Sequence, residues 1–298
     1  MMPQPSSDFS RTSHPRSFTL CADDYGLTPG IGQGIRALIT AGALSATGCM
    51  TVSPFWPEEA RLLQPLEGRA DLGLHLTLTD HHPLGSLPDL APEGRFPPVG
   101  KLLLRALRRQ LKAPEIKAEI LRQIDSFRDH FGRLPDFVDG HHHVHQFPII
   151  RDALIEAIGE RLTPGRFWVR SCYESPFATL RRGIDAPRAL IITQLGWGLD
   201  RRLKRLGWAH NRGFRGIYDF SDRVAYGDLL PKFLERPRPD MLVMCHPGLV
   251  DEALLAVESL TYRREHELAF LASPAFPALL DQRGLSLSRP SLALHSPS

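Results

Sequence analysis

The segment FTLCADDYG, residues 18–26, decides the fold class. It begins with an apolar run, Phe18–Ala22, and continues into two adjacent carboxylates, Asp23 and Asp24, and then a glycine. A helical pattern follows over Ile31–Ala41, where apolar residues recur at a spacing of three to four. A strand, a turn and a helix in this order are typical of a βα unit of a parallel sheet.

The same unit recurs along the chain. Six further apolar runs bring the number of predicted strands to seven. They are Ala46–Val52, Leu72–Leu78, Phe137–Asp139, Phe167–Ser171, Gly216–Phe220 and Met241–Cys245. Helical patterns also cover Ile116–Phe131, Ile149–Gly159, Tyr226–Leu234 and Tyr262–Leu271. Residues 80–99 contain five prolines and are expected to form a long loop that shapes a substrate site. We therefore predict an α/β fold.

Length and composition indicate one large domain. The chain has 298 residues, of which 42% are hydrophobic and 23% charged, so a sizeable core is available. Because α/β barrels reach about 250 residues as one unit, we predict a single domain over residues 17–287. Residues 1–16 lack the apolar core of a signal peptide and are expected to be a disordered tail. Residues 288–298 are expected to be frayed, and no apolar run is long enough to span a membrane.

Charge and cysteine usage narrow the class of protein. The net charge is only +3, which gives no case for nucleic-acid binding. Basic clusters lie at residues 105–112 and 201–205, and we interpret them as solvated helix faces, the alternative being contact with an anionic lipid surface or substrate. The cysteines form no CxxC pair and are predicted to be buried, reduced thiols, which favours a cytoplasmic protein: Cys21, Cys49, Cys172 and Cys245.

The adjacent carboxylates Asp23 and Asp24 stand where the first predicted strand ends. In α/β barrels this edge of the sheet collects the active-site residues. Two neighbouring carboxylates repel each other when both are charged, and a bound cation relieves that repulsion. The pair therefore indicates a catalytic or metal-binding role, the alternative being an aspartate that caps the following turn.

The segment DGHHHVH, residues 139–145, places four histidines directly after a predicted strand. Packing does not explain this density, and imidazole is a common metal ligand. His141 with His145 would suit a helical turn, whereas His141 with His143 would suit an extended one. Asp139 is expected to accept a hydrogen bond from a ligand histidine and so to select its tautomer.

Three further polar residues lie in or after predicted strands. His75 lies in the alternating segment GLHLTLT, where a single histidine is more often a core residue than a ligand. His246 follows the last predicted strand in MCHPG, and its ordinary pKa near neutrality suits a general acid. Arg170, in FWVRS, is interpreted as a residue that reaches the substrate or orients Asp23, the alternative being a solvated side chain.

Polar residues at the ends of several separate strands indicate a common site more strongly than any one of them does. An aspartate with two histidines leaves open positions for water and is typical of a catalytic metal site. The motifs ADDYG, GLHLTLT, DGHHHVH and MCHPG also resemble, in this order, those of the YdjC-like family of chitooligosaccharide deacetylases over about residues 18–285. Tyr25 and Gly140 replace the usual phenylalanine and serine. The resemblance implies a distorted (β/α) barrel of about seven strands, related to polysaccharide deacetylases.

The resemblance also implies roles for individual residues. Asp24, His75 and His141 would hold one divalent metal ion, and Asp23 would act as the catalytic base. His246 falls on a position that lines the site. Magnesium is the ion that the family implies, although histidine and carboxylate ligands also suit zinc and other transition metals.

Together these observations predict a metal-dependent hydrolase that removes an N-acetyl group from an amino sugar or amino-sugar conjugate. An N-acetylated amino sugar is therefore the expected partner, and a homodimer is a further option. One alternative is a metal-dependent phosphoester hydrolase, which needs more carboxylates and a second ion. Another is a non-catalytic metal-binding or sugar-binding protein of the same fold, against which the presence of Asp23 and His246 argues.

Overall fold

The computed structural model describes residues 16–221, 223–238, 240–258 and 260–294. Arg16 begins the first strand, and the rest of the expected N-terminal tail lies outside the described residues. No helix in this part of the chain is long and apolar enough to cross a membrane.

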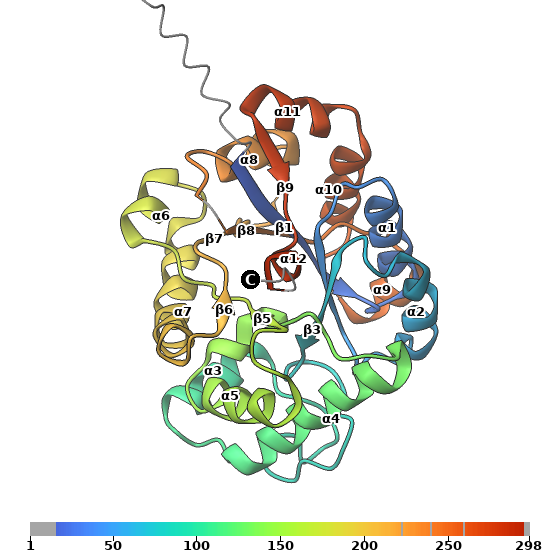
Figure 1. The fold of residues 1–298 in the computed structure, drawn as a ribbon. Coiled ribbons are helices and arrows are strands. Elements are labelled where there is room, and N and C mark those ends of the chain that lie inside the picture. The colour runs from blue at the N-terminus through green and yellow to red at the C-terminus, as the bar shows by residue number, and fades with distance from the viewer. Residues whose placement is uncertain (1–15, 222, 239, 259, 295–298) are drawn as a thin grey trace, which may run out of the picture.

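The described chain carries nine strands in one parallel sheet: β1 (Arg16–Tyr25), β2 (Ala46–Cys49), β3 (Asp71–Leu76), β4 (Phe137–Gly140), β5 (Trp168–Val169), β6 (Ala209–His210), β7 (Phe214–Arg215), β8 (Met241–Cys245) and β9 (Leu285–Leu287). Their order is β6-β5-β4-β3-β2-β1-β8-β7, and β9 pairs with the start of β1. The sheet curls on itself, but no ladder joins β6 to β7 among the described residues (Figure 1). This confirms the α/β fold and the distorted (β/α) barrel.

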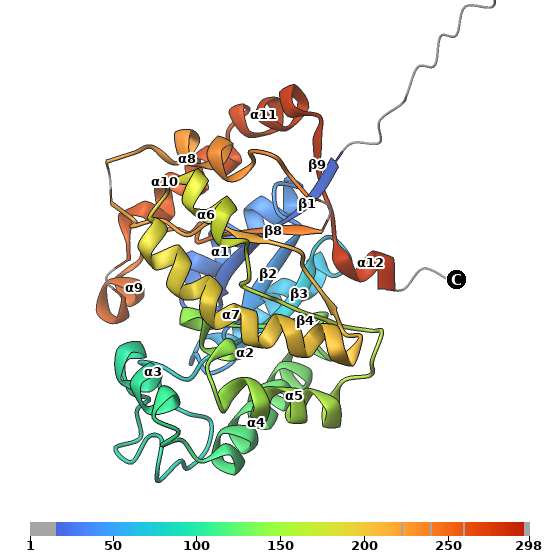
Figure 2. The same cartoon turned by 90° about the vertical axis from the view of Figure 1, so that its left-hand side faces the viewer.

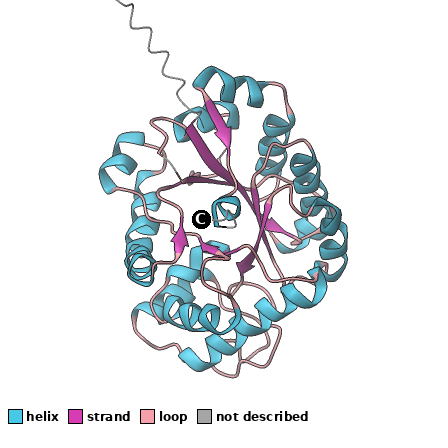
Figure 3. Cartoon of the chain, viewed as in Figure 1, coloured by secondary structure: helices cyan, strands magenta, loops and turns pink. Residues whose placement is uncertain are grey.

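Helices surround the curled sheet (Figure 3). They are α1 (Pro29–Thr40), α2 (Trp56–Leu63), α3 (Val99–Leu107), α4 (Ala113–Phe131), α5 (Ile150–Arg161), α6 (Pro176–Arg182), α7 (Ala186–Leu206), α8 (Tyr226–Phe233), α9 (Glu252–Val257), α10 (Tyr262–Ala272), α11 (Ala275–Arg283) and α12 (Pro290–Leu294). Two short 3-10 segments, η1 (Gln64–Leu66) and η2 (His141–Gln146), complete the described elements.

The central strand β1 is apolar because both of its faces are covered. Phe18 and Leu20 pack against Ile31 and Ile35 of α1 in the layer between sheet and helices. Cys21, on the other face, belongs to a smaller apolar cluster with Trp168 inside the curled sheet. A strand buried on both faces reads as a continuous apolar run, which is why its sequence predicts a parallel sheet.

Two predictions about strands need correction. The strand expected at Gly216–Phe220 is instead β7, which ends at Arg215. Gly216 has a φ of +107°, and a side chain there would collide with the carbonyl oxygen of Met244, so the chain turns away from the sheet at this residue. The strands β6 and β9 are absent from the predicted set because runs of two and three residues are too short to show a periodic pattern.

The frayed C-terminal tail expected from residue 288 is also wrong for residues 288–294. Ser288 donates its backbone N–H to the carbonyl oxygen of Phe18, and α12 follows (Figure 2). Ser291 donates its backbone N–H and its hydroxyl to Asp71, a fully buried carboxylate at the start of β3. A buried carboxylate must be hydrogen-bonded, and the tail supplies these bonds. Residues 295–298 lie outside the described part.

Candidate metal and catalytic site

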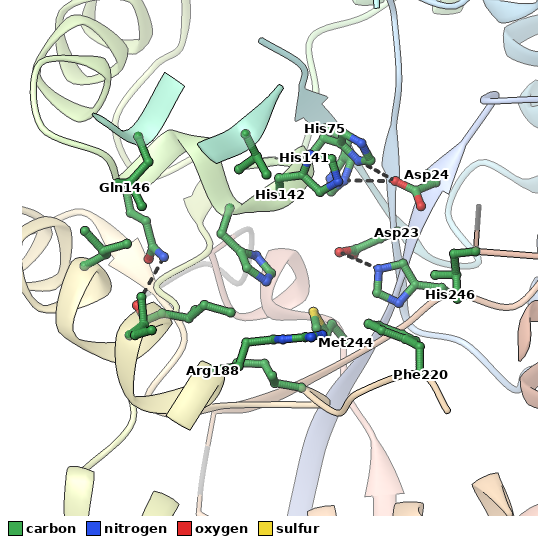
Figure 4. Close-up of a pocket in the computed structure, with 18 of the residues that line it drawn as sticks. Asp23, Asp24, His75, His141, His142, Gln146, Arg188, Phe220, Met244 and His246 are labelled. Atoms are coloured by element: carbon green, nitrogen blue, oxygen red, sulfur yellow. Dashed lines mark hydrogen bonds and ion pairs between the residues drawn. The ribbon is translucent and has the colours of Figure 1, made fainter. Parts of the chain in front are cut away.

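The carboxyl ends of the parallel strands meet at one edge of the sheet, where a cavity of about 420 Å³ opens. Its polar lining includes residues from all four sequence motifs: Asp23, Asp24, His75, His141 and His246 (Figure 4). Much of the remaining lining is apolar: Val99, Leu103, Phe147, Ile191, Ile192, Leu195, Ile217, Phe220, Met244 and Leu260. The structure therefore brings the predicted site together, with Arg170 as the exception.

Asp24, His75 and His141 converge although they come from three strand ends. Oδ1 of Asp24 lies 3.3 Å from Nε2 of His75 and 3.0 Å from Nδ1 of His141. One ligand atom from each residue lies within 4.8 Å of the other two, and all three residues are buried. This is the set that the resemblance to the YdjC-like family implies, and its metal-binding role stays a prediction.

The donor set fits a divalent ion. Asp139 accepts a hydrogen bond at 2.7 Å from Nδ1 of His75, so Nε2 is the ring atom left to face Asp24. This is the contact expected of Asp139, and such a carboxylate behind a histidine is the usual support of a metal ligand. Two imidazoles and one carboxylate suit zinc and similar ions, and three protein ligands leave positions for water and substrate.

A backbone irregularity lets the adjacent residues Asp23 and Asp24 serve different neighbours. The register between β1 and β2 shifts between Ala22 and Tyr25, and Asp24 has a φ of +67°. Positive φ is uncommon outside glycine and often marks a functional site. The bulge allows Asp24 to meet the two histidines while Asp23 meets Arg170.

The predicted contact between Arg170 and the substrate is wrong. Arg170 is fully buried and is not part of the cavity lining, because two carboxylates hold its guanidinium beneath the site. It donates to both oxygens of Asp23, at 2.8 and 2.5 Å, and lies 2.5 Å from Oδ2 of Asp139. The other interpretation, that Arg170 orients Asp23, agrees with these contacts. Cys21, Asp23 and Asp139 form a second group of converging ligand atoms, but Arg170 supplies the cation there.

Charge–charge interactions outweigh burial at three of these groups. Burial would raise the pKa of Asp23, but the charges of Arg170 and His75 lower it well below its usual value. The pKa of Asp24 is lowered in the same way, against burial, by Arg264 and His141. For His75, burial lowers the pKa, yet Asp139 and Asp23 raise it to about 10. The site thus concentrates negative charge that a proton or a metal ion neutralises.

The pKa of His246 is lower than the near-neutral value expected for this residue. Burial is the largest cause, and it lowers the pKa of His246 to about 4 although Asp24 and Asp23 raise it. Nε2 of His246 lies 4.0 Å from Oδ2 of Asp23, and its backbone N–H donates to Glu267 at 2.6 Å. The imidazole is therefore neutral at neutral pH and can take up a proton as well as give one.

The segment η2 places His143 and His145 away from His141 and Asp24. Both lie outside the group of converging ligand atoms in the described residues, and the histidine beside His141 in that group is His75. Nε2 of His145 lies 3.0 Å from the carbonyl oxygen of Arg170, while Nδ1 of His143 lies 3.7 Å from Sγ of Cys172. His143 has a φ of +58°, which breaks the regular turn that spacing rules assume.

Sequence reasoning missed Arg264 on α10. Its side chain is buried, lines the cavity and donates from NH2 to Oδ2 of Asp24 at 2.7 Å. Arg264, Glu267 and Leu271 share the buried face of α10. Charged residues on the apolar face of a helix need buried partners. The placement of Arg264 and Glu267 on one face with Leu271 could therefore have indicated a buried polar site.

The model of the YdjC-like protein family matches residues 17–282. The chain belongs to the YdjC-like family. A carbohydrate deacetylase of Geobacillus stearothermophilus is 28% identical over 282 residues, which cover 92% of this chain and 96% of that protein. A chitooligosaccharide deacetylase of Serratia marcescens is 30% identical over 267 residues, which cover 89% and 94%.

A solved structure supports the fold of this YdjC-like chain. It belongs to a protein of Enterococcus faecalis V583 whose proposed role is cellobiose-phosphate cleavage. The two superpose with a TM-score of 0.72 at 21% identity, covering 93% of this chain and 98% of the other. At this identity the likeness shows a shared fold and carries no statement about substrate.

Proposed function

We propose that this YdjC-like chain is a metal-dependent carbohydrate deacetylase, which hydrolyses the N-acetyl group of an amino sugar or amino-sugar conjugate. One observation carries the proposal. Two adjacent carboxylates face the same cavity with different partners, Asp24 with two histidines and Asp23 with Arg170. A site with one metal and a separate base needs this division. The two deacetylases that resemble the chain over most of its length support the choice of reaction.

Asp24, His75 and His141 are the residues that would hold the ion. An ion held there would polarise the amide carbonyl and lower the pKa of a water molecule. Asp139 fixes the ring of His75, and Arg264 holds the second oxygen of Asp24. Magnesium is the ion that family resemblance favours, and zinc is the main competitor.

Asp23 is proposed as the base. It accepts a proton from water while the water oxygen forms a bond to the acetyl carbon. Because Arg170 keeps the pKa of Asp23 low, Asp23 is a carboxylate at every working pH and does not retain the proton. His246 has the higher pKa of the two and lies 4.0 Å away, a separation that one water molecule bridges. The proton therefore passes to His246.

His246 then delivers the proton to the sugar nitrogen as the carbon–nitrogen bond breaks. Acetic acid and a free amine are the products, and both protons of the water are accounted for, one on the amine and one on the acid. A histidine that begins neutral suits this order of events, because His246 receives its proton only after Asp23 has removed it from the water molecule.

The test is acetate release from N-acetylglucosamine and chitooligosaccharides, with and without a chelator. We expect Asp23→Asn to bind metal like the parent but to show no turnover, and His141→Ala to lose both. Asp89→Asn, in the loop away from the cavity, should keep full activity. Near-parental turnover by metal-loaded Asp23→Asn would rule out the assignment.

The same assay separates the alternatives. A phosphoester hydrolase with two ions would need a second metal group, and Arg170 already neutralises Asp23 and Asp139 in the one available. When a phosphorylated sugar is added to the substrates, release of phosphate from it without release of acetate from the acetylated sugars would nevertheless establish that activity. Binding of metal and sugar without release of either product would identify a binding protein.

We also propose a cytoplasmic location and a single functional domain. All four cysteines are buried and free, which suits a reducing compartment. One sheet contains every described strand from β1 to β9. The homodimer remains a proposal that light scattering coupled to size-exclusion chromatography would test.

A further inference from the structure

Seven large apolar side chains are exposed on three helices, α3, α6 and α7. Figure 2 shows where these helices lie. Each of the seven exposes between 44% and 72% of its surface: Leu104, Leu107, Phe177, Leu180, Ile191, Trp197 and Leu206. Single exposed apolar residues are ordinary, but several on three helices are not. The helix α6 packs against α7, and α3 and α7 both border the cavity through Leu103 and Leu195. We name this group of three helices the apolar–basic face.

Some cations on this face are paired, such as Arg182 with Glu174 and Arg202 with Asp152, but others lack an acidic partner. Among the described residues, no carboxylate lies within ion-pair distance of six of them: Lys101, Arg108, Arg109, Arg181, Arg201 and Arg205. No acidic residue occurs from residue 96 to residue 114. The acidic residues of the two later helices are already neutralised, Asp185 by Arg188 and Asp200 by Lys204.

Two other helices, α2 and α4, show the opposite pattern. Every lysine and arginine of α2 and α4 has a carboxylate partner: Arg61 with Glu58, Lys117 with Glu160, Arg122 with Glu119, and Arg128 with Asp125. Among the described residues, cations without a carboxylate partner also occur on other helices, such as Lys232 on α8 and Arg283 on α11, but six of them gather on α3, α6, α7 and the turn that follows α3. Local, unneutralised positive charge attracts an anionic partner.

Aromatic residues on the face lie beside some of these cations. The guanidinium of Arg201 lies 4.7 Å from the ring centroid of Trp197, and that of Arg181 lies 5.8 Å from the ring centroid of Phe177. Exposed aromatic rings next to basic groups match the boundary between lipid headgroups and acyl chains, where tryptophan and arginine are both favoured.

We propose that α3, α6 and α7 form a docking surface for an anionic phospholipid bilayer. The exposed leucines and aromatic residues would enter the interfacial region, and the unpaired cations would contact the lipid phosphates. Since no described helix can span a bilayer, the contact is lateral. Docking places the cavity, which residues of α3 and α7 help to line, near the membrane surface. The proposal concerns location and does not depend on the reaction at the site.

Sedimentation with lipid vesicles tests the docking surface. The full-length chain should bind vesicles of phosphatidylcholine with 30 mol% phosphatidylglycerol, and the binding should fall as salt rises. It should bind pure phosphatidylcholine at least tenfold more weakly. The triple variant Lys101→Gln, Arg108→Gln, Arg109→Gln should lose about 100-fold in affinity for the anionic vesicles, since each basic residue contributes about fivefold.

A matched variant controls for net charge. Arg61→Gln, Lys117→Gln, Arg128→Gln removes the same charge from α2 and α4 and should bind like the parent. The double variant Leu104→Ser, Leu107→Ser should also bind more weakly, because it removes the apolar part of the face. In addition, Trp197 fluorescence should shift to the blue with anionic vesicles, and Trp197→Phe should remove that shift.

Three results would overturn the proposal. One is no binding to anionic vesicles by the parent chain at low salt. Another is equal loss of binding in the two charge variants, which would show that only net charge matters. The third is a dimer that Leu104→Ser, Leu107→Ser converts to a monomer while vesicles are not bound, since the face would then be a contact between copies. Circular dichroism and thermal unfolding of each variant establish that it is folded.

Discussion

Nδ1 of His75 lies 2.7 Å from Oδ1 of Asp139, and this contact determines which ring atom of His75 faces Asp24. The neighbouring strand leaves room for it because residue 48 is glycine. A side chain at Gly48 would lie 2.9 Å from Nδ1 of His75 and 3.1 Å from Oδ1 of Asp139. The predicted metal ligand is therefore oriented by a partner on β4 and by a gap on β2.

Asp139→Asn should weaken metal binding by about 10- to 100-fold, because an amide holds the ring of His75 less firmly than a carboxylate does. Isothermal titration with Mn²⁺ or Zn²⁺ measures the change. Asp136→Asn is the matched control, since Asp136 is on the same segment but contacts Leu72 and Arg133 instead of the site. Unchanged metal affinity in a folded Asp139→Asn variant would contradict the support role of Asp139.

Arg264→Gln should also weaken metal binding, since Oδ2 of Asp24 loses its charged donor at 2.7 Å and the carboxylate is free to rotate. Arg264→Lys should recover part of the affinity, because it restores the charge but not the planar donor pair. Arg263→Gln removes a neighbouring buried arginine that contacts Val224 and stacks on Tyr218, so it controls for the loss of a buried cation on α10. Equal metal affinity in all three variants would refute the role.

Glu267 should make stability depend on pH. Burial is the largest cause that raises its pKa, from 4.5 to about 7, so the folded chain binds the proton more tightly than the unfolded chain does. The stability due to this proton is complete below pH 4.5 and is lost as the pH rises through about 7. The shift corresponds to about 3 kcal/mol.

Urea unfolding of the parent and of Glu267→Gln between pH 5 and pH 8 measures this effect. The amide cannot ionise, so the variant should gain stability relative to the parent as the pH rises. A constant difference between the two across this range would show that Glu267 does not titrate there. If the variant loses the hydrogen bonds from Tyr218 and His246, the free energy of unfolding falls by the same amount at every pH, so its dependence on pH is not affected.

Ser291→Ala should destabilise the fold by about 1–3 kcal/mol, because the buried carboxylate of Asp71 loses a hydroxyl donor. Ser286→Ala, on β9, is the control, as its hydroxyl makes no hydrogen bond within the described residues. Chemical denaturation compares the two. Equal stability would mean that α12 is not anchored through Asp71.

The sequence is sufficient to predict the class of fold and most of the site. A parallel strand buried on both faces must be apolar, so runs such as Phe18–Ala22 are visible without a structure. Their carboxyl ends must meet at one edge, so Asp24 and His141 could be expected to lie near each other, whereas the choice of His75 as their partner rests on the family resemblance. Prediction from the spacing of residues fails where strands are short, as at β6 and β9, or where a turn is irregular, as at η2.

Only the tertiary structure decides what each polar side chain contacts. Arg170 and Arg264 have no local pattern that separates one from the other, yet one holds Asp23 beneath the cavity and the other holds Asp24 at its wall. The pKa of His246 likewise follows from burial by distant segments, and so do the partners of the last helix. Sequence periodicity reports which faces are apolar, whereas hydrogen bonds and charges between distant residues depend on how those faces are brought together.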